Sequence, residues 1–195
     1  MITKPHIVLV GNAPSLLERP GFGAVIDAFP VVVRFNNFQT RGYERFVGAK
    51  TDWWARAENA DIAPRTERLT RILLRLQGES EDTFNAGVAT VLPTVVAQNP
   101  GVSVEVIPQR VFTDLICAYG FQNAPLTGTL VAAHLLASHE RIAVCGFDNL
   151  TGTPESLRHY YSPENVIGDW TTYHEPMKEA AYLREMVNAG RVSVL

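Results

Sequence analysis

The 195-residue sequence lacks the features that would place it in several common classes of protein. No apolar run approaches the roughly 18 residues that cross a bilayer, so no membrane-spanning helix is predicted. The opening segment MITKPHIVLVGN has no signal-peptide cleavage site, and we therefore expect a cytoplasmic protein. A formal net charge of -3 provides no basic field for a polyanion, so nucleic acid is not an expected partner.

Metal and phosphate signatures are equally scarce. Cys117 and Cys145 lie far apart without metal-ligand spacing, and we expect two buried thiols in a reducing compartment. Asp-x-Asp does not occur, so the carboxylate pair that holds a divalent ion in many nucleotide-sugar enzymes is missing. There is also no GxGxxG fingerprint. We therefore expect neither a metal nor a cofactor.

Short β-branched runs alternate with helical patterns along the chain. Strands are predicted at residues 7–10, 31–35, 50–55, 72–76, 88–92, 103–107, 142–144 and 192–195. Helices are predicted at residues 24–29, 109–119, 127–138 and 176–189, with Thr127 as a helix cap. This alternation predicts one α/β domain over 1–195, Rossmann-like, with a mainly parallel central sheet.

Polar residues follow the first two predicted strands. Asn12 and Ser15 lie in the turn after the first strand, and Asn36 ends the second. Open α/β sheets bind ligands at the carboxyl ends of their strands, and side-chain amides can pair with a ribose or a base edge. An equally good interpretation is that these asparagines only make the turns.

Residues 157–190 contain two histidines of interest. His159 opens an HYY triplet, and His174 lies two residues before Pro176, which suits the first turn of a helix. Gly190 suits the left-handed end of the same helix. The positive end of a helix dipole disfavours imidazolium, so His174 is predicted to be neutral and able to act as a general base. A histidine at a surface or core edge is the commoner case.

Four separated stretches, taken together and in order, resemble the animal-type sialyltransferases, glycosyltransferase family 29. The long sialylmotif is similar to VLVGNAPSL at 8–16, VVVRFN at 31–36 and YERFVGAKT at 43–51. The short motif is similar to PLTGTLVAAHLL at 125–136 and IAVCGF at 142–147. The third motif resembles the HYY triplet, and the very short motif, His-x4-Glu, resembles His174 with Glu179.

The resemblance implies a variant GT-A fold and an inverting, metal-independent enzyme that moves sialic acid from a CMP-activated donor to a glycan or glycolipid hydroxyl. By position, the family's substrate-binding residues correspond to Asn12, Ser15, Asn36, Thr127, Gly128, Gly146 and Tyr160. His159 would bind the donor phosphate and stabilise the leaving CMP, while His174 would take the acceptor's proton. Glu179 would support the site structurally.

The residues suit this chemistry. The leaving CMP is already a phosphate monoester, so one or two positive donors can stabilise it without a metal. An acceptor hydroxyl is a poor nucleophile. A neutral imidazole can accept its proton as the glycosidic bond forms. Base and leaving group stand on opposite sides of the anomeric carbon in an inverting displacement, so two histidines with separate roles are expected.

The sequence also departs from the family pattern. Ala13 and Leu126 stand where the family usually has serine, and Ile7 and His139 stand where it has the cysteines of a disulfide. The chain is short, as for a soluble bacterial relative whose acceptor-binding loops are reduced or supplied by a partner. Transfer from CMP-Kdo, hydrolysis of a CMP-sugar and a nucleotide-binding module without transfer activity therefore stay open.

Overall fold

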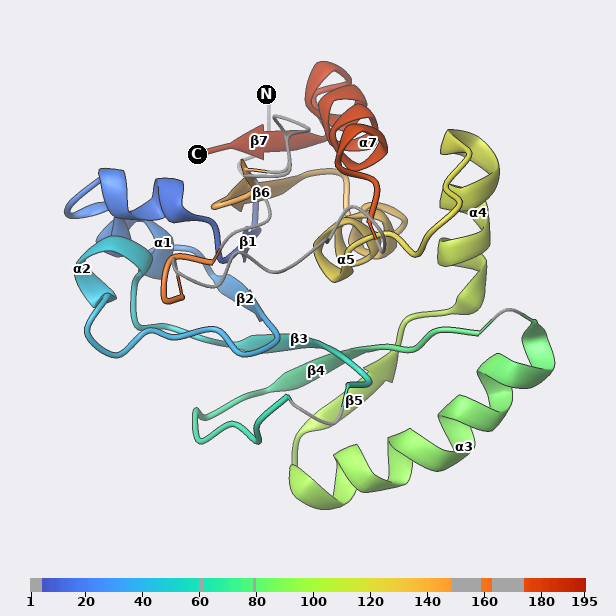
Figure 1. The fold of residues 1–195 in the computed structure, drawn as a ribbon. Helices are drawn as coiled ribbons and strands as arrows, with labels where there is room; N and C mark the ends of the chain where they lie inside the picture. The colour runs from blue at the N-terminus through green and yellow to red at the C-terminus, as the bar shows by residue number, and fades with distance from the viewer. Residues whose placement is uncertain (1–4, 60–61, 79, 149–158, 163–173) are drawn as a thin grey trace.

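The computed structural model describes residues 5–59, 62–78, 80–148, 159–162 and 174–195. Within them, one parallel sheet runs in the order β5-β4-β3-β2-β1-β6-β7 (Figure 1). Its strands are β1 (Ile7–Val10), β2 (Val31–Phe35), β3 (Trp53–Ala57), β4 (Arg71–Arg75), β5 (Ser103–Val106), β6 (Ile142–Cys145) and β7 (Val192–Val194). The predicted α/β class with a parallel sheet is confirmed.

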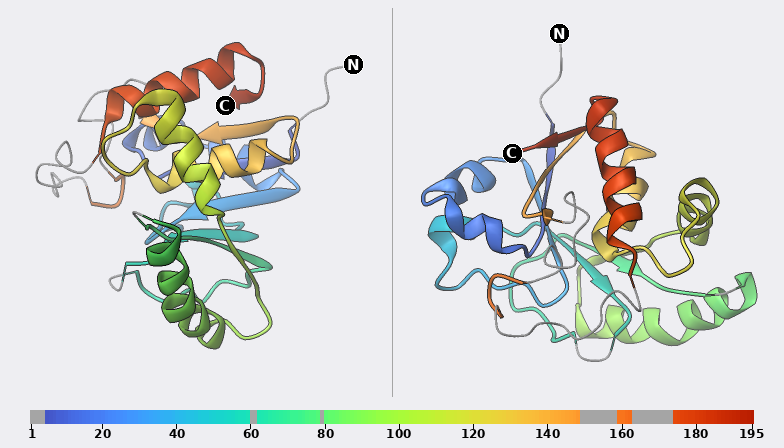
Figure 2. Two further views of the ribbon diagram at one scale, coloured as in Figure 1. Left: turned by 90° about the vertical axis from the view of Figure 1, so that its right-hand side faces the viewer. Right: turned by 45° about the horizontal axis from the view of Figure 1, so that its top comes forward.

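Helices cover both faces of the sheet. They are η1 (Pro14–Glu18), α1 (Phe22–Asp27), α2 (Glu44–Val47), α3 (Glu81–Gln98), α4 (Gln109–Tyr119), α5 (Thr127–Leu136) and α7 (Pro176–Asn188). One face is covered by η1, α1 and α2 at its β1, β2 and β6 half and by α3 at its β3–β5 half. The other face is covered by α4, α5 and α7, and Figure 2 shows α3 and α7 on opposite sides of the sheet.

Burial on both faces explains the apolar composition of the central strands. Every residue of β1 is buried, with Ile7 and Leu9 in the core under α5 and Val8 and Val10 in the core under α1. Successive side chains of a strand point to opposite faces, so a strand covered on both sides must be apolar at every position. This is why these strands were predictable from the sequence.

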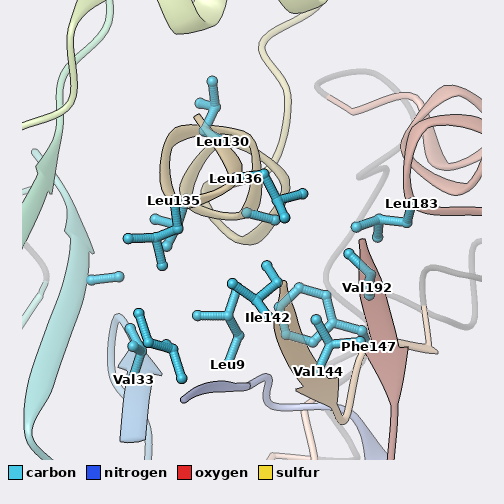
Figure 3. Packing of buried hydrophobic residues seen from close by; sticks show 14 of the residues in the cluster. Leu9, Val33, Leu130, Leu135, Leu136, Ile142, Val144, Phe147, Leu183 and Val192 are labelled. Carbon is cyan, nitrogen blue, oxygen red and sulfur yellow. The ribbon is translucent and has the colours of Figure 1, made fainter. Parts of the chain in front are cut away.

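The largest core lies between the sheet and α5 (Figure 3). Leu135 and Leu136 of α5 pack toward Leu9, Val33 and Ile142 of the sheet, as the figure shows. The helix also contacts α4 and α7, so it is apolar around most of its circumference. Its first turn is thereby held at the carboxyl edge of the sheet.

The sheet reverses its direction of growth between β1 and β6. The chain adds β2 to β5 on one side of β1 and then returns to place β6 on the other side. In such a sheet the loops that follow the two central strands diverge, and ligands bind outside their carboxyl ends. Here those loops begin at Gly11 and Gly146.

The predicted strand at 88–92 is wrong, because these residues lie inside α3. Ser80 caps this helix, since its hydroxyl accepts from the Thr83 amide while the Thr83 hydroxyl accepts from the Ser80 amide. Its apolar residues recur at helical spacing and pack against the sheet: Phe84, Val88, Val91, Leu92 and Val95. That period was the signal for a helix.

Two smaller differences concern the N-cap of α5 and one of the cysteines. The N-cap of α5 is Leu126, and Thr127 is the first helical residue rather than the cap. Cys117 is exposed on α4, whereas Cys145 is buried as expected, and burial raises the pKa of its thiol to about 12. None of the described helices has both the length and the apolar composition to span a bilayer.

Candidate active site

The loop after β1 places Asn12 where the sheet reverses its growth. Its Nδ2 donates to the carbonyl oxygen of Phe35 at the end of β2, 3.2 Å away. Its Oδ1 is buried and accepts no hydrogen bond from any described residue. A buried acceptor without a donor is costly unless a ligand supplies one. Asn12 therefore presents a hydrogen-bond acceptor at this edge of the sheet.

The same loop is joined tightly to the loop after β6. The Gly11 amide donates to the Cys145 carbonyl at 2.9 Å, and the Ala13 amide donates to the Gly146 carbonyl at 3.3 Å. A Cβ on Gly11 would lie 2.1 Å from the Gly146 oxygen, so only glycine allows this approach. Gly146 itself has a φ of 64°, in the left-handed region that favours glycine.

Ser15 reinforces this junction. Both its amide, at 3.3 Å, and its hydroxyl donate to the carboxylate of Asp148, which follows β6. The hydroxyl proton is therefore used within the protein. Ser15 holds the two loops together, whatever contact its oxygen makes with a ligand.

Asn36 makes the turn at the end of β2. Its φ is 48°, and asparagine tolerates this left-handed conformation better than most residues. Its Oδ1 accepts from the Ala57 amide at 3.0 Å, and its carbonyl accepts from the Trp54 indole at 2.9 Å. Asn36 thus forms the turn, and its role in ligand binding stays a prediction. Its Nδ2 makes no hydrogen bond within the described ranges and can still donate to a ligand.

The HYY triplet lies directly against the first loop. The Tyr160 amide donates to the Asn12 carbonyl at 2.8 Å. The Tyr160 ring is buried edge-to-face on Tyr43 with centroids 5.1 Å apart, and its hydroxyl donates to the Gln39 carbonyl. Burial raises the pKa of this phenol to about 12, so it stays neutral. Tyr160 therefore anchors the triplet.

His159 directly precedes Tyr160, so the contacts of Tyr160 fix its position. Its ring is half-buried, with its centroid 5.1 Å from the ring centroid of Tyr161. Burial lowers the pKa of His159 below its usual 6.5, so the ring is neutral at pH 7. A neutral imidazole can donate one N–H to a phosphate. The negative charge of a bound phosphate would raise the pKa of the ring and favour its doubly protonated form.

His174 immediately precedes Glu175, the N-cap of α7, as predicted. Its Nδ1 lies 3.2 Å from the Ala124 carbonyl oxygen, which can only accept. The proton is therefore on Nδ1, and Nε2 is the basic nitrogen. Burial lowers the pKa of His174, and the positive charge of Arg75 adds to this against the opposing hydrogen bond. The ring is neutral at pH 7, chiefly because it is desolvated.

Glu179 joins α7 to the start of α5. Its carboxylate is fully buried, with Oε1 accepting from the Leu126 amide at 2.7 Å and Oε2 accepting from the Thr129 hydroxyl. Burial raises the pKa of Glu179 to about 7, although both hydrogen bonds and the charge of Arg75 oppose the rise. This carboxyl ties the first turn of α7, which follows His174, to the start of α5.

Gly128 links the two halves of the site. A Cβ on Gly128 would lie 2.9 Å from Cε1 of Phe147, which follows Gly146 after β6. The first turn of α5, with Thr127 buried in it, therefore packs against the loop at the junction with β1. The amides of a helix N-terminus favour an anion.

The sequence-predicted residues thus lie along one edge of the sheet. Asn12, Asn36, Gly146 and the HYY triplet gather around the carboxyl ends of β1, β2 and β6. His174 and Glu179 gather at the N-terminus of α5. Across the described ranges, no three His, Cys, Asp or Glu side chains are arranged to hold a metal ion. The absence of a metal requirement stays a prediction.

Sequence reasoning missed Arg75. This residue ends β4, is only 8% exposed and exerts its charge on both His174 and Glu179. The available signal was a charged residue directly after the apolar run ILL, at the strand end where α/β proteins bind ligands.

Comparison with known proteins identifies relatives. Residues 6–67 match Glycosyltransferase family 29 (sialyltransferase). The chain is 26% identical over 214 residues to the mouse and human proteins named CMP-N-acetylneuraminate-beta-1,4-galactoside alpha-2,3-sialyltransferase, covering 96% of this chain and 56% of each of them. It thus spans just over half the length of these curated relatives.

Solved structures show the same fold. A mammalian sialyltransferase matches with a TM-score of 0.66 and 17% identity, over 97% of this chain and 68% of that one. A mammalian sialyltransferase in complex with Gal-beta-1-3GalNAc-ortho-nitrophenol matches with a TM-score of 0.67 and 16% identity, over 98% and 69% respectively. At this identity the two likenesses establish a shared arrangement of helices and strands.

Proposed function

We propose that the chain transfers sialic acid or a related sugar acid from a CMP-activated donor to a glycan hydroxyl, because residues 6–67 match glycosyltransferase family 29, the sialyltransferases, and because its curated and solved relatives are sialyltransferases. The observation that carries this proposal is the hydrogen bond from the Tyr160 amide to the Asn12 carbonyl, 2.8 Å long. It holds the triplet containing His159 against the nucleotide-binding loop, although the two lie far apart in the sequence.

The donor nucleotide is assigned to the carboxyl ends of β1, β2 and β6. The unpartnered Oδ1 of Asn12 can accept from a cytosine amine or a ribose hydroxyl, and Nδ2 of Asn36 can donate. The phosphate would lie between the N-terminal turn of α5, at Thr127 and Gly128, and the ring of His159. The close packing of Gly128 on Phe147 supports this assignment, because it brings the helix end to the same junction.

Acceptor activation is assigned to His174. Its basic Nε2 would take the proton of the acceptor hydroxyl as that oxygen attacks the anomeric carbon. His159 would meanwhile donate a proton or a hydrogen bond to the leaving phosphate, which stabilises its developing charge. The two rings are held by different anchors, Tyr160 and Glu179, which suits their placement on opposite sides of the reacting carbon.

Metal independence is part of the proposal. A departing phosphate monoester can be stabilised by His159 and the amides of α5 alone. Addition of EDTA should leave the transfer rate unchanged. A rate that falls on chelation and recovers with Mg²⁺ or Mn²⁺ would contradict this scheme.

The finer classification is proposed in the same way. The parallel sheet with its ligand edge at the β1–β6 junction supports a variant GT-A fold, in one catalytic domain over 1–195. A cytoplasmic location is expected, and cell fractionation would test it.

Calorimetry with CMP, UMP and GMP tests the donor assignment. We expect CMP to bind at least tenfold more tightly than the other two, and equal affinities would remove the cytidine assignment. His174→Ala should abolish transfer and keep CMP affinity within about twofold, whereas His159→Ala should weaken CMP about tenfold or more, because it removes a hydrogen bond to a charged group. His139→Ala is the matched control, since its ring contacts Leu135 at the far end of α5.

The same enzyme preparation separates the remaining alternatives. Release of CMP from CMP-N-acetylneuraminate without an acceptor would indicate hydrolysis. CMP binding without any turnover, with or without lactose, would indicate a nucleotide-binding module. A faster turnover with the corresponding CMP-Kdo donor would change the assigned sugar while keeping the site.

A further inference from the structure

Arg75 stands at the carboxyl edge of β4. Leu73, two residues earlier, lies in the core under α5, and alternate side chains of a strand share a face. The side chain of Arg75 therefore lies on the α5 side of the sheet, at its ligand-binding edge. Its charge acts on His174 and Glu179 there, which places the guanidinium near the assigned general base.

The Nε of Arg75 is buried and has no hydrogen-bond partner among the described residues. No hydrogen bond or ion pair joins the side chain to any residue that the structure describes. Glu58 and Glu179 are the acidic groups whose charges reach it, and neither is hydrogen-bonded to it. A largely buried cation with an unbonded Nε–H destabilises the fold, so a structural role does not account for Arg75.

Two other buried arginines show what a structural role looks like. The guanidinium of Arg34 donates to three protein oxygens, at distances of 2.7 to 3.1 Å. Arg56 donates to two backbone carbonyls and lies 5.1 Å above the Trp54 ring. Both cations are satisfied by the protein itself. Arg75 is 8% exposed, and its guanidinium donates no hydrogen bond to an oxygen of any described residue.

We propose that Arg75 binds a carboxylate of the substrate, adjacent to the hydroxyl that His174 activates. A guanidinium matches a carboxylate with two parallel hydrogen bonds, and a bound carboxylate would supply the missing partner. This inference rests on the proposed function: a sugar-acid donor carries its carboxylate on the reacting anomeric carbon itself. An acidic residue of the acceptor glycan would present the same chemistry from the other side.

The first measurement is calorimetry of Arg75→Gln with two probes, CMP and CMP-N-acetylneuraminate. If the carboxylate is the donor's, the variant loses about tenfold to hundredfold in affinity for CMP-N-acetylneuraminate and stays within about twofold for CMP, since hydrogen bonds to charged groups have this magnitude. Arg71→Gln is the matched control. It lies on the same strand and face, partly exposed, in an ion pair with Glu105 at 3.3 Å, and should change neither affinity.

The second measurement identifies an acceptor carboxylate. In that case Arg75→Gln raises the KM for a glucuronic acid-bearing galactoside tenfold or more, and leaves the KM for lactose and the affinity for the donor unchanged. If neither the CMP-N-acetylneuraminate affinity nor the KM of the acidic acceptor responds, the assignment of Arg75 is refuted. If the wild-type protein fails to bind CMP at all, the proposed function fails first, and the carboxylate assignment fails with it.

A third measurement is independent of turnover. Arg75→Met replaces an unpaired buried cation with an apolar chain of similar length, so its thermal midpoint should equal or exceed that of the wild type. Arg34→Met removes a cation whose three hydrogen-bonded partners stay buried, so its midpoint should fall. A comparable fall for Arg75→Met would show that Arg75 supports the fold and would overturn the proposal.

Discussion

The buried carboxyl of Glu179 makes the stability of this protein depend on pH in an unusual direction. Glu179 is fully buried, and burial raises its pKa to about 7. The substitution that tests this is Glu179→Gln, which has the same shape. The amide oxygen of glutamine can still accept from the Leu126 amide, and its NH2 group can donate to the Thr129 hydroxyl oxygen.

The magnitude follows from proton linkage. An unfolded glutamate has a pKa of about 4.5, so between pH 4.5 and pH 7 the folded protein holds a proton that the unfolded chain has lost. The folded pKa is raised, and therefore this contribution to stability is present at low pH and lost as pH rises. The slope is about 1.4 kcal/mol per pH unit, or about 3 kcal/mol over the whole window.

Glutamine carries no such proton, so the two proteins should diverge as pH rises. At pH 5 their free energies of unfolding should differ by less than about 1 kcal/mol, and at pH 8 the glutamine variant should be the more stable by about 3 kcal/mol. Urea unfolding at pH 5, 6, 7 and 8, followed by tryptophan fluorescence, measures this. His159 and His174 titrate in both proteins, so their contributions cancel in the difference.

Glu175→Gln is the matched control on the same helix. Burial tends to raise the pKa of Glu175, but hydrogen bonds from Lys178 and from the amides of Asn123 and Gln122 lower it overall. This carboxylate is ionised in both states above pH 5, so its variant should show a constant difference from the wild type. Parallel pH profiles for the wild type and Glu179→Gln would refute the reasoning, because they would show that Glu179 is ionised in the folded protein throughout.

Three further predictions concern the loops and the base. Gly11→Ala should destabilise the protein by about 3 kcal/mol in urea unfolding, because the new Cβ would meet the Gly146 oxygen at 2.1 Å; a loss below 1 kcal/mol would mean that the junction is loose. Asn36→Ala should lower the free energy of unfolding by about 1–3 kcal/mol, because alanine neither accepts from the Ala57 amide nor favours the left-handed φ of 48°. Asn36→Gly should lower it less, because glycine adopts this φ and loses only the hydrogen bond. Equal losses would assign the whole effect to that bond. The kcat/KM profile should keep its plateau down to pH 6.5 and fall only below it, because the pKa of His174 is lowered; a midpoint above 6.5 would contradict a desolvated base.

Local sequence patterns revealed most of the strands, because the central strands are buried on both faces. The residues of β1 and β2 are β-branched and apolar almost without interruption, and this pattern does not depend on knowing the neighbours. The region around 88–92 misled because Val88 and Val91 have high strand propensity. There the packing of a helical stripe on the sheet, together with the Ser80 cap, decided the structure.

The candidate site also has a part that the sequence predicted and a part that it did not. Its loop residues were predictable, since polar side chains at strand ends and the motif order are properties of the chain itself. How the site is held was not predictable. Glu179 rather than Thr127 satisfies the start of α5, and the main cause of the low pKa of His174 is burial, which no local pattern reports.

The amino-acid sequence by itself therefore determined the alternation of strands and helices, the turns that end the strands and the motifs that resemble glycosyltransferase family 29. Only the tertiary structure decided that β6 returns beside β1, that Tyr160 bonds to Asn12, and that Arg75, whose Nε has no partner among the described residues, lies near His174. The physical reason is the range of the interactions. Propensity and periodicity act over a few residues, whereas desolvation, charge and hydrogen-bond pairing depend on which distant segments the fold brings together.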